Sequence, residues 1–324
     1  MAQALVNSHL STKNPVTTAD KDRYIANQNG GRSLQLDGKQ VPLDQSLAND
    51  KLTRVERAKI HVPAIFWNYE KSCPVVVHAP VTSDYAHSRR IPIHDQGDRQ
   101  TCIAFATLGA IELFLARRGQ VVNLSPQYAN WIFMRRAIPP RDWCHDDVRL
   151  ADALVCLSEI GVCAETLCRY ESLSALHTRC DQRPSLNAQR HAHYGIKKYS
   201  LIDNVGLDGP SIANIVFLEN IVSQGFDIIV TVGVAFGRHD IDHVYDVMRD
   251  GEDIPWAPTD AHCVVIVGYD RGARKPFFIC RNSWGKDTGA DGYLLLSYDY
   301  IRTYALYGAV VLDVATDRAM PARY

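Results

Sequence analysis

The pattern of apolar and polar positions divides the chain into a helical first half and a strand-rich second half. Apolar residues between positions 103 and 115 cover more than one face of a helix, which predicts a largely buried helix that ends at Gly119. Ser125 followed by Pro126 is typical of a helix start. A further run with helical spacing, "DDVRLADALVCLSEIGV", stops at Gly161.

After residue 190 the pattern changes to short β-branched or aromatic runs separated by Gly, Asp and Pro. One helical segment, "PSIANIVFLENIVSQG", interrupts these predicted strands. A helical half followed by a strand-rich half predicts an α+β protein whose two lobes meet at a cleft. The predicted strands are "HYGIKKYSLI", "FDIIVTVGVAF", "HCVVIVGYD", "KPFFICRNSW", "GYLLLSYDYI" and "YGAVVLDVA", with an earlier one at "PVVVHAP".

The first part of the chain has a different composition. Residues 1 to about 60 are rich in Asn, Asp, Gln, Ser and Lys, with scattered apolar residues, so burial there offsets little of the entropy lost on ordering. We expect partial disorder in this part and compact structure from "IHVPAIFWNYE" onward.

Charge and hydropathy exclude several classes of partner. The 35 Lys and Arg balance 36 Asp and Glu, which predicts no nucleic-acid partner and no attraction to an anionic membrane surface. The absence of a signal-peptide pattern predicts cytoplasmic synthesis and leaves export by a specialised secretion system open. Nine cysteines, an odd number in a long chain without an export signal, are interpreted as mostly reduced thiols.

A candidate nucleophile lies where a polar turn enters the long buried helix. Cys102 in "IHDQGDRQTCIAFATLGAIELFLARRG" lies at this predicted helix start. Unpaired backbone N–H groups and the partial positive charge of a helix N-terminus favour the thiolate form there. A reactive thiol also needs a base and a group that orients that base. His262 precedes one predicted strand and Asn282 follows the next, so adjacent strands can bring the two side chains together.

The segments "DQGDRQTCIAFA", "AHCVVIVGYD" and "RNSWGKDTGADGY" resemble the signature blocks of the papain-like cysteine peptidases. The pieces "LSPQYANW" and "LSEIGVCAETLCRY" resemble segments of bacterial-type members of that family, so the likeness covers roughly residues 88 to 312. The resemblance implies a two-lobe fold, with a helical lobe and an antiparallel β-barrel-like lobe, and the active site in the cleft between them.

The family's roles map onto five residues of this chain. Cys102 would be the nucleophile, His262 the general base and later acid, and Asn282 the residue that orients the imidazole. Gln96, six residues before Cys102, matches the oxyanion-hole glutamine, and Trp284 matches the tryptophan that shields the Asn–His hydrogen bond. The usual Cys-Gly-Ser-Cys-Trp is replaced by "DRQTCI", which changes the substrate groove beside the nucleophile without removing a proton-transfer group.

Each of these residues has a structural interpretation when it is taken alone. Cys102 and His262 could be packed core side chains, Asn282 a turn residue, and Gln96 a solvated loop side chain. Their joint occurrence favours catalysis. The other cysteine and histidine groups lack the spacing of a zinc site, so we expect thiols and charged loop residues there rather than a metal site: Cys144, His145, Cys156, Cys163, Cys168, His239, Asp240, Asp242, His243 and Cys263, the last in a strand core.

The domain prediction places an N-terminal tail or candidate prosegment at residues 1–85 and a catalytic domain at 86–324. Within the latter we expect a helical lobe over about 96–190 and a β lobe over about 191–315. The tail occupies the position of a family prosegment without its long helical motif, so a cleft-blocking role and a plain flexible tail both stay open. The loop "GRHDIDHVYDVMRDGEDIPWAPTD" is expected near the cleft.

The predicted function is hydrolysis of peptide bonds in a protein or peptide substrate through a thioester acyl-enzyme, as an endo- or exopeptidase. No metal and no organic cofactor are expected. Two alternatives stay open: acyl transfer, in which an amine resolves the thioester, and a catalytically silent papain-fold binding protein.

Overall fold

The computed structural model describes the backbone of residues 80–83, 85–136, 148–171, 183–207, 209–234, 243–247 and 260–317, together with five short strands nearer the N-terminus. Three of these, β1 (Ile25–Ala26), β2 (Arg32–Leu36) and β3 (Lys39–Leu43), pair antiparallel in a small sheet that the sequence pattern did not predict. The other two, β4 (Trp67–Asn68) and β5 (Cys73–Pro74), also pair. Apart from Pro74 and Pro80, the predicted strand "PVVVHAP" lies outside the described residues. The same holds, apart from β1, β2 and β3, for the residues up to about 60 in which partial disorder is expected.

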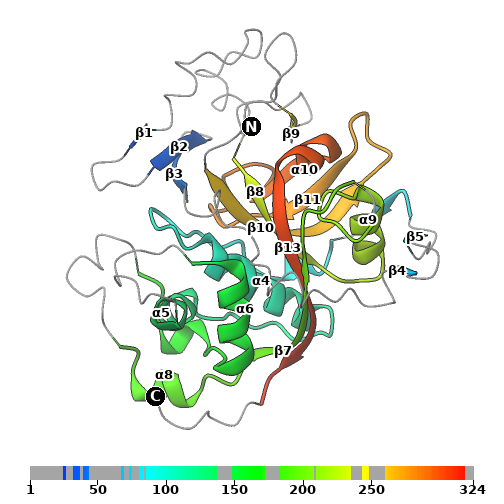
Figure 1. Cartoon of the computed structure of the whole chain (residues 1–324). Helices are drawn as coiled ribbons and strands as arrows, with labels where there is room; N and C mark the ends of the chain where they lie inside the picture. Colours follow the sequence, from blue (N-terminus) through cyan, green and yellow to red (C-terminus); the bar gives the residue numbers. More distant parts are fainter. Residues whose placement is uncertain are drawn as a thin grey trace.

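The helices between residues 102 and 190 gather on one side of the molecule, whereas most strands lie on the other side together with the helices at 215–223 and 298–304 (Figure 1). The helices and 3-10 turns are η1 (Ser88–Arg90), α4 (Cys102–Ala116), α5 (Pro126–Arg136), α6 (Leu150–Glu159), η2 (Glu165–Leu167), α8 (Leu186–Arg190), α9 (Ile215–Ser223) and α10 (Tyr298–Tyr304). The strands of the main sheet are β6 (Thr82–Ser83), β7 (Gly195–Ile202), β8 (Ile228–Gly233), β9 (Val244–Tyr245), β10 (Ala261–Asp270), β11 (Phe277–Arg281), β12 (Tyr293–Ser297) and β13 (Ala305–Ala315).

The main sheet runs in the order β7-β13-β8-β10-β11-β12-β9, with β6 beside β10. Its pairings are antiparallel except that β12 and β9 run parallel. The long strands β13 and β7 leave the strand-rich side and run beside α6 (Figure 1). The predicted α+β fold with a helical lobe and a largely antiparallel β lobe is therefore confirmed.

Strand β10 shows why the sheet can be covered on both faces. Cys263, Val265 and Val267 belong to the core cluster that contains α4, whereas Val264 and Ile266 belong to the cluster that contains α9 and α10. Successive side chains of a strand point to opposite faces, so a continuous apolar run fills two cores at once. His262, expected just before this strand, is its second residue.

The predicted helix starts and ends agree with the structure in the helical lobe. Every residue of α4 is buried, as its all-round apolar pattern predicts, and the chain turns at Gly119 with φ of 81°. The Ser125 hydroxyl caps α5 by accepting a 3.0 Å hydrogen bond from the Tyr128 N–H. The prediction is wrong at residues 298–301: "SYDYI" was assigned to a strand, but Ser297 caps α10 by accepting from the Tyr300 N–H at 2.9 Å.

A buried carboxylate joins the lobes near the C-terminal end of α4. Arg117 follows α4 and donates to both oxygens of Asp227, at 2.8 and 3.2 Å. His87 Nε2 lies 2.9 Å from the same carboxylate. Asp227 itself directly precedes β8, so its side chain connects the helical lobe, the segment before η1 and the sheet.

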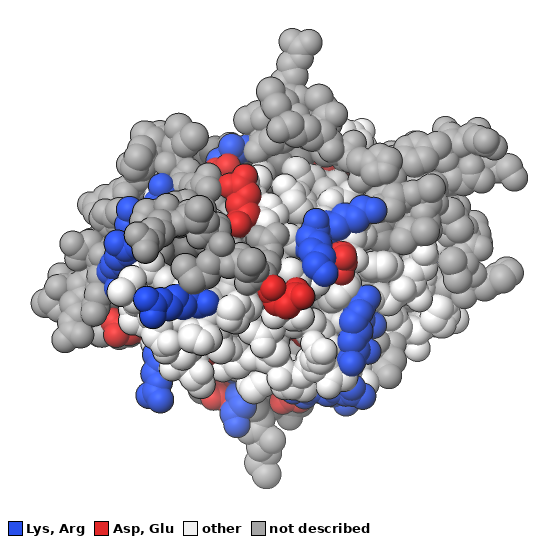
Figure 2. All heavy atoms as spheres, turned by 90° about the horizontal axis from the view of Figure 1, so that it is seen from below, with Lys and Arg blue, Asp and Glu red and all other residues white. Residues whose placement is uncertain are grey.

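The molecular surface carries both signs of charge. On the face shown in Figure 2, the described Lys and Arg side chains lie interspersed with Asp and Glu among uncharged residues. Within the described residues, no helix combines the length and the apolar character that crossing a membrane requires. The cysteines whose side chains the structure describes are free thiols: Cys102, Cys156, Cys163, Cys168, Cys263 and Cys280.

Candidate active site

Cys102 is the first residue of α4, at the position predicted for a nucleophile. It is 2% exposed and lies in the core cluster where α4 packs against the sheet. The peptide dipoles of this 15-residue helix place a partial positive charge at its N-terminus, where the sulfur is held. The helix terminus therefore supplies at Cys102 the electrostatic feature that the sequence pattern predicts there.

The imidazole of His262 is fixed by two neighbours from the chain after β11. Asn282 Oδ1 accepts a 2.8 Å hydrogen bond from His262 Nε2. Because Nε2 then carries the proton of the neutral ring, Nδ1 is the nitrogen with a lone pair. The Trp284 indole stacks on the imidazole with ring centroids 4.1 Å apart and an angle of 21° between the planes. This stacking covers the ring and keeps water from one of its faces.

Strand pairing brings His262 and Asn282 together. In the antiparallel pair β10–β11, Val265 lies opposite Arg281, so the residue after Arg281 continues alongside the beginning of β10. On the other side of β10, His262 lies opposite Val232 of β8. The positions of the base and its orienting amide are thus set by backbone register, which the sheet's hydrogen bonds determine.

Burial controls the protonation of His262. Loss of hydration lowers its pKa from 6.5 to about 4, although the hydrogen bond with Asn282 acts in the opposite direction. The imidazole is therefore neutral at pH 7 in this structure. A neutral imidazole has the lone pair that acceptance of a thiol proton requires.

Gln96 lies in a loop that is tied to the segment carrying Asn282 and Trp284. The Gln96 N–H donates to the Ser283 carbonyl at 2.8 Å, and the Ser283 hydroxyl donates to Gln96 Oε1 at 2.6 Å. Gln96 Nε2 donates to the Arg99 carbonyl at 2.7 Å. An amide nitrogen carries two protons, so one N–H remains for a further acceptor. These bonds fix Gln96 against the segment that contains Asn282 and Trp284. The same loop then continues to Cys102.

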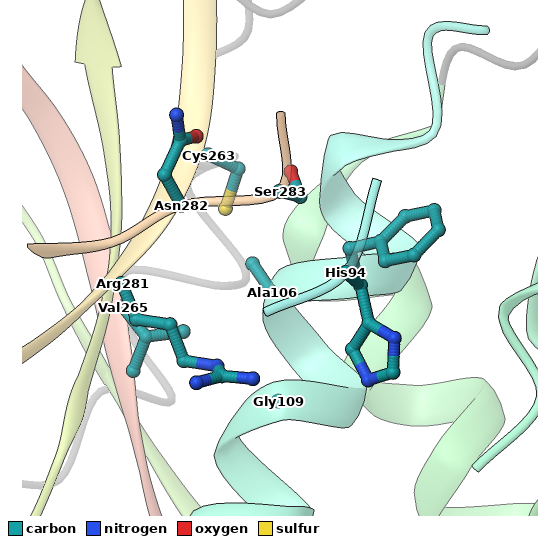
Figure 3. A pocket seen from close by; sticks show the side chains of 9 residues that line it. His94, Ala106, Gly109, Cys263, Val265, Arg281, Asn282 and Ser283 are labelled. Carbon is teal, nitrogen blue, oxygen red and sulfur yellow. The ribbon is translucent and has the colours of Figure 1, made fainter. Parts of the chain in front are cut away.

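A cavity of about 20 Å³ lies beneath these residues, between α4 and the strands β10 and β11. Figure 3 shows Arg281 and His94 reaching into the space over Gly109 from opposite sides. Neither Cys102 nor His262 lines the cavity, and its size is that of about one water molecule, so it is too small to serve as a substrate groove. Burial lowers the pKa of the Arg281 guanidinium, which donates to the carbonyls of Ser88 and Ile91.

The remaining candidate residues do not form a second centre in the described part of the chain. Among the described residues, no group of three or more His, Cys, Asp or Glu side chains is placed to hold a metal ion. Burial raises the pKa of the Cys163 thiol to about 12, and Cys263 is a core residue of β10, as predicted. Cys144, His145, His239, Asp240 and Asp242 lie outside the described residues.

The comparison with known families decides the identity of this fold and site. Residues 79–312 match the family model of the papain family cysteine proteases. This chain belongs to that family. The family match confirms the resemblance that the sequence blocks around Cys102, His262 and Asn282 indicate.

Proteins from animals and bacteria are similar to this chain in sequence or in structure. Peptidase 1 of Dermatophagoides pteronyssinus is 29% identical over 228 residues, which cover 68% of this chain and 62% of the relative. The chain thus spans less than two thirds of that relative's length. The crystal structure of xylellain, a cysteine protease from Xylella fastidiosa, is similar with a TM-score of 0.60 at 22% identity, covering 80% of this chain and 94% of xylellain.

A further similar structure is that of digestive procathepsin L 3 from the larval midgut of Tenebrio molitor. It has a TM-score of 0.54 at 18% identity and covers 83% of this chain and 78% of that protein. At such identities the structural likeness supports the shared fold and nothing finer. The five residues singled out in the sequence keep their candidate roles.

Sequence reasoning missed the residues that hold the candidate site residues in place. Ser283 stands between Asn282 and Trp284 in a motif that the sequence analysis quoted, so its position carried a usable signal. Arg99 lies within the Gln96 loop and accepts from the Gln96 side chain through its carbonyl, whereas Tyr170 contacts the loop from far away in sequence. Tyr170 ends a segment that the family resemblance covers, but its contact with the loop depends on how the lobe folds.

Proposed function

We propose that this chain hydrolyses peptide bonds through a thioester acyl-enzyme in which Cys102 is the nucleophile. The observation that carries the proposal is the His262–Asn282 hydrogen bond of 2.8 Å, with Trp284 stacked on the imidazole. This arrangement fixes the ring and leaves Nδ1 as its basic atom. The nucleophile at the start of α4 and the base on β10 come from two lobes that pack together through α4 and the sheet.

The proposed reaction proceeds in two halves. Cys102 gives its proton to His262 Nδ1, and the sulfur attacks the peptide carbonyl carbon to form a C–S bond. The C–N bond then breaks as Nδ1–H protonates the leaving amine. In the second half a water molecule loses a proton to His262 and attacks the thioester, which releases the acid and restores the thiol. Gln96 Nε2–H and the Cys102 N–H would stabilise the oxygen anion in both halves.

The N-terminal tail is proposed to restrict access to the site, with residues 1–85 as its extent. Two observations support a restricted state: Cys102 and His262 are only 2% and 1% exposed. The structural neighbours include proforms, among them the Tenebrio procathepsin and a ragweed pollen cysteine protease with a TM-score of 0.52. Because β6 already pairs with β10, a truncation that tests this role must begin before Thr82.

The nucleophile is tested by cleavage-site profiling on a peptide library with the wild-type chain and with Cys102→Ala. We expect cleavage to be abolished in Cys102→Ala and preserved in Cys168→Ala, which removes a half-buried thiol. Iodoacetamide at neutral pH should label Cys102 in the wild type. Cleavage by Cys102→Ala, or failure of both labelling and cleavage in the wild type, would refute the proposal.

The tail and the fate of the thioester are tested on the same peptides. A chain that starts near residue 60 should cleave faster than the full chain, and equal rates would contradict restriction by the tail. With an added amine acceptor, the acid product should still predominate. An amide product instead would show that the thioester is resolved by acyl transfer.

A further inference from the structure

The loop between Gln96 and Cys102 rests on one side chain from a distant part of the chain. The Tyr170 hydroxyl donates to the Gln96 carbonyl at 2.9 Å. The same hydroxyl lies 2.6 Å from Thr101 Oγ1, the hydroxyl of the residue just before the nucleophile. One phenol oxygen therefore contacts both ends of the loop that connects Gln96 with Cys102.

The direction of these hydrogen bonds follows from the proton count. A phenol has a single O–H proton, and the Gln96 carbonyl can only accept, so the Tyr170 proton goes to Gln96. Thr101 must then donate its own proton to the Tyr170 oxygen. The two bonds form a chain from Thr101 through Tyr170 to Gln96, in which each bond polarises the next.

The ring of Tyr170 holds the middle of the loop as well. The Arg99 guanidinium lies over the ring, with its central carbon 4.8 Å from the ring centroid. Arg99 also donates to Gln127 Oε1 at 2.6 Å and to the Glu171 carbonyl at 3.0 Å. The Arg99 carbonyl accepts from Gln96 Nε2, so the residue under the ring orients the Gln96 amide directly.

Tyr170 also contacts α4, the helix that begins with Cys102. Phe105, in the first turn of α4, packs edge-to-face on Tyr170, with ring centroids 4.9 Å apart and an interplanar angle of 81°. The backbone of Tyr170 is fixed in turn, because its N–H donates to Glu165 Oε1 at 2.7 Å. Tyr170 thus contacts the loop at its start, middle and end, and the helix that follows it.

We propose that Tyr170 is a positioning residue that sets the geometry of Gln96 relative to Cys102. This inference rests on the proposed role of Gln96 as an oxyanion donor. The Tyr170 hydroxyl fixes the Gln96 backbone, and its ring fixes Arg99, whose carbonyl orients the Gln96 amide. Loss of the hydroxyl should weaken stabilisation of the oxyanion while leaving the thiol and its base in place.

The test compares Tyr170→Phe with wild type in two reactions. Peptide hydrolysis builds negative charge on a carbonyl oxygen, whereas alkylation of Cys102 by iodoacetamide displaces iodide at a carbon and needs only the thiolate. We expect kcat for hydrolysis to fall about fivefold to tenfold, as for one lost neutral hydrogen bond, with KM and the alkylation rate within about twofold. A peptide aldehyde, whose adduct carries the same oxygen, should bind correspondingly more weakly.

The matched control is Tyr269→Phe, which also removes one hydroxyl-to-carbonyl bond, the 3.0 Å contact with Pro80 at the far end of β10. It should leave kcat and alkylation unchanged. Thr101→Val removes the other hydroxyl of the hydrogen-bond chain from Thr101 to Gln96. It should also lower kcat without changing the alkylation rate, but by a smaller factor than Tyr170→Phe. If Tyr170→Phe does not fold, Thr101→Val on the same two readouts decides the matter.

The role of Tyr170 and the role of Gln96 can be contradicted separately. Wild-type kcat in Tyr170→Phe, or an equal loss in alkylation and hydrolysis, overturns the positioning role. Gln96→Ala measured alongside distinguishes this from a failure of the proposed function. If Gln96→Ala hydrolyses peptides at the wild-type rate, the oxyanion role of Gln96 is wrong; if it loses activity and Tyr170→Phe does not, only the inference about Tyr170 fails.

Discussion

The two sides of the candidate site are held in place by different means. On the β side, His262 and Asn282 are positioned by strand register, with β10 paired to β8 and β11 along its length. On the helical side, Gln96 lies in a loop with isolated backbone bonds, such as that from its N–H to the Ser283 carbonyl, and with side-chain bonds from Tyr170 and Ser283. A continuous ladder of backbone bonds holds the proposed base, whereas isolated backbone bonds and hydroxyl groups hold the proposed oxyanion donor.

This difference predicts how each side responds to mutation. Register is a collective property, so a single substitution in the β side removes a function without moving its neighbours. The loop has no ladder of backbone bonds, so its geometry depends on individual side chains. Among substitutions that shorten a side chain, those on the β side should therefore lower activity only when they remove a group of the site, whereas those on the helical side should also do so when they remove a distant support.

The largest effect is expected from removal of the base. His262→Ala should lower kcat/KM for peptide hydrolysis by about 10²–10⁴-fold, because general acid–base catalysis contributes on that order. Steady-state kinetics on a fluorogenic peptide measures this loss. His191→Ala, which removes an exposed histidine of the helical lobe, is the control and should keep wild-type rates. A loss below tenfold in His262→Ala would contradict its assignment as the base.

Removal of the proposed oxyanion donor should have the next largest effect. Gln96→Ala is expected to lose about 10²–10³-fold in kcat, since one donor of this kind contributes about 2.7–4 kcal/mol of transition-state stabilisation. The rate of Cys102 alkylation should stay near wild type. Gln120→Ala, at an exposed position after α4, serves as the control. Parallel losses in alkylation and hydrolysis would show that Gln96 acts on the thiol instead.

The buried imidazole should make the stability of the fold depend on pH. Since the pKa of His262 is lowered from 6.5 to about 4, the unfolded chain binds a proton between these values that the folded chain does not. Acidification through this window should destabilise the fold by about 3 kcal/mol, a loss that is absent well above pH 6.5 and complete below about pH 4.

Urea unfolding in a Cys102→Ser background measures this effect, because no thiolate is then available to pair with the imidazole. The control adds His262→Gln to the same background. The double variant should lose less stability between pH 7 and pH 4 than the single one. Identical pH dependence in both would show that His262 is not the group that titrates.

The smallest effects are expected from substitutions of two glycines, one in the Gln96 loop and one on the β side. Gly97 in the Gln96 loop has φ of 61° with no atom within 4 Å of an added Cβ, so Gly97→Ala should cost only the backbone strain of about 1–2 kcal/mol. Gly292, whose carbonyl accepts from Asn282, has φ of 85°, and an added Cβ would lie 2.6 Å from Ile93 Cγ2. Gly292→Ala should therefore destabilise more, since it adds overpacking to strain.

Urea unfolding of both glycine variants measures the difference. Gly292→Ala should also lower kcat, because Ile93 lies three residues before Gln96 and must move. Equal stabilities of the two variants would mean that Ile93 moves away from the added methyl group without loss of stability. The tight contact between Gly292 and Ile93 would then not restrain the Gln96 loop.

The fold could be predicted from the sequence where local rules act. The buried helix from Cys102, its end near Gly119 and the Ser125 cap all follow from patterns within a few residues. The helix α10 was missed because Tyr and Ile after β12 suit a strand as well as a helix, and the cap at Ser297 decided the outcome. The pairing of β7 with β13 joins distant segments, and nothing in either strand specifies its partner.

The site shows the same division between local and distant information. Cys102, His262, Asn282, Gln96 and Trp284 were found because each stands in a short recognisable block. Tyr170 ends the segment "LSEIGVCAETLCRY", which carries part of the family resemblance, but nothing in that segment shows whether the tyrosine faces solvent or the loop it supports. Its role depends on the packing of η2 and the following residues against α4, which only the folded structure brings about.

The contact of Asp227 with Arg117 and His87 has a consequence for how the molecule unfolds. If one lobe melted while the other stayed folded, this carboxylate would be left buried without the cation that offsets its lost hydration. A half-folded molecule is therefore destabilised at the end of α4 opposite to Cys102. We expect both lobes to melt in one cooperative transition, observed as coincident curves by fluorescence and circular dichroism.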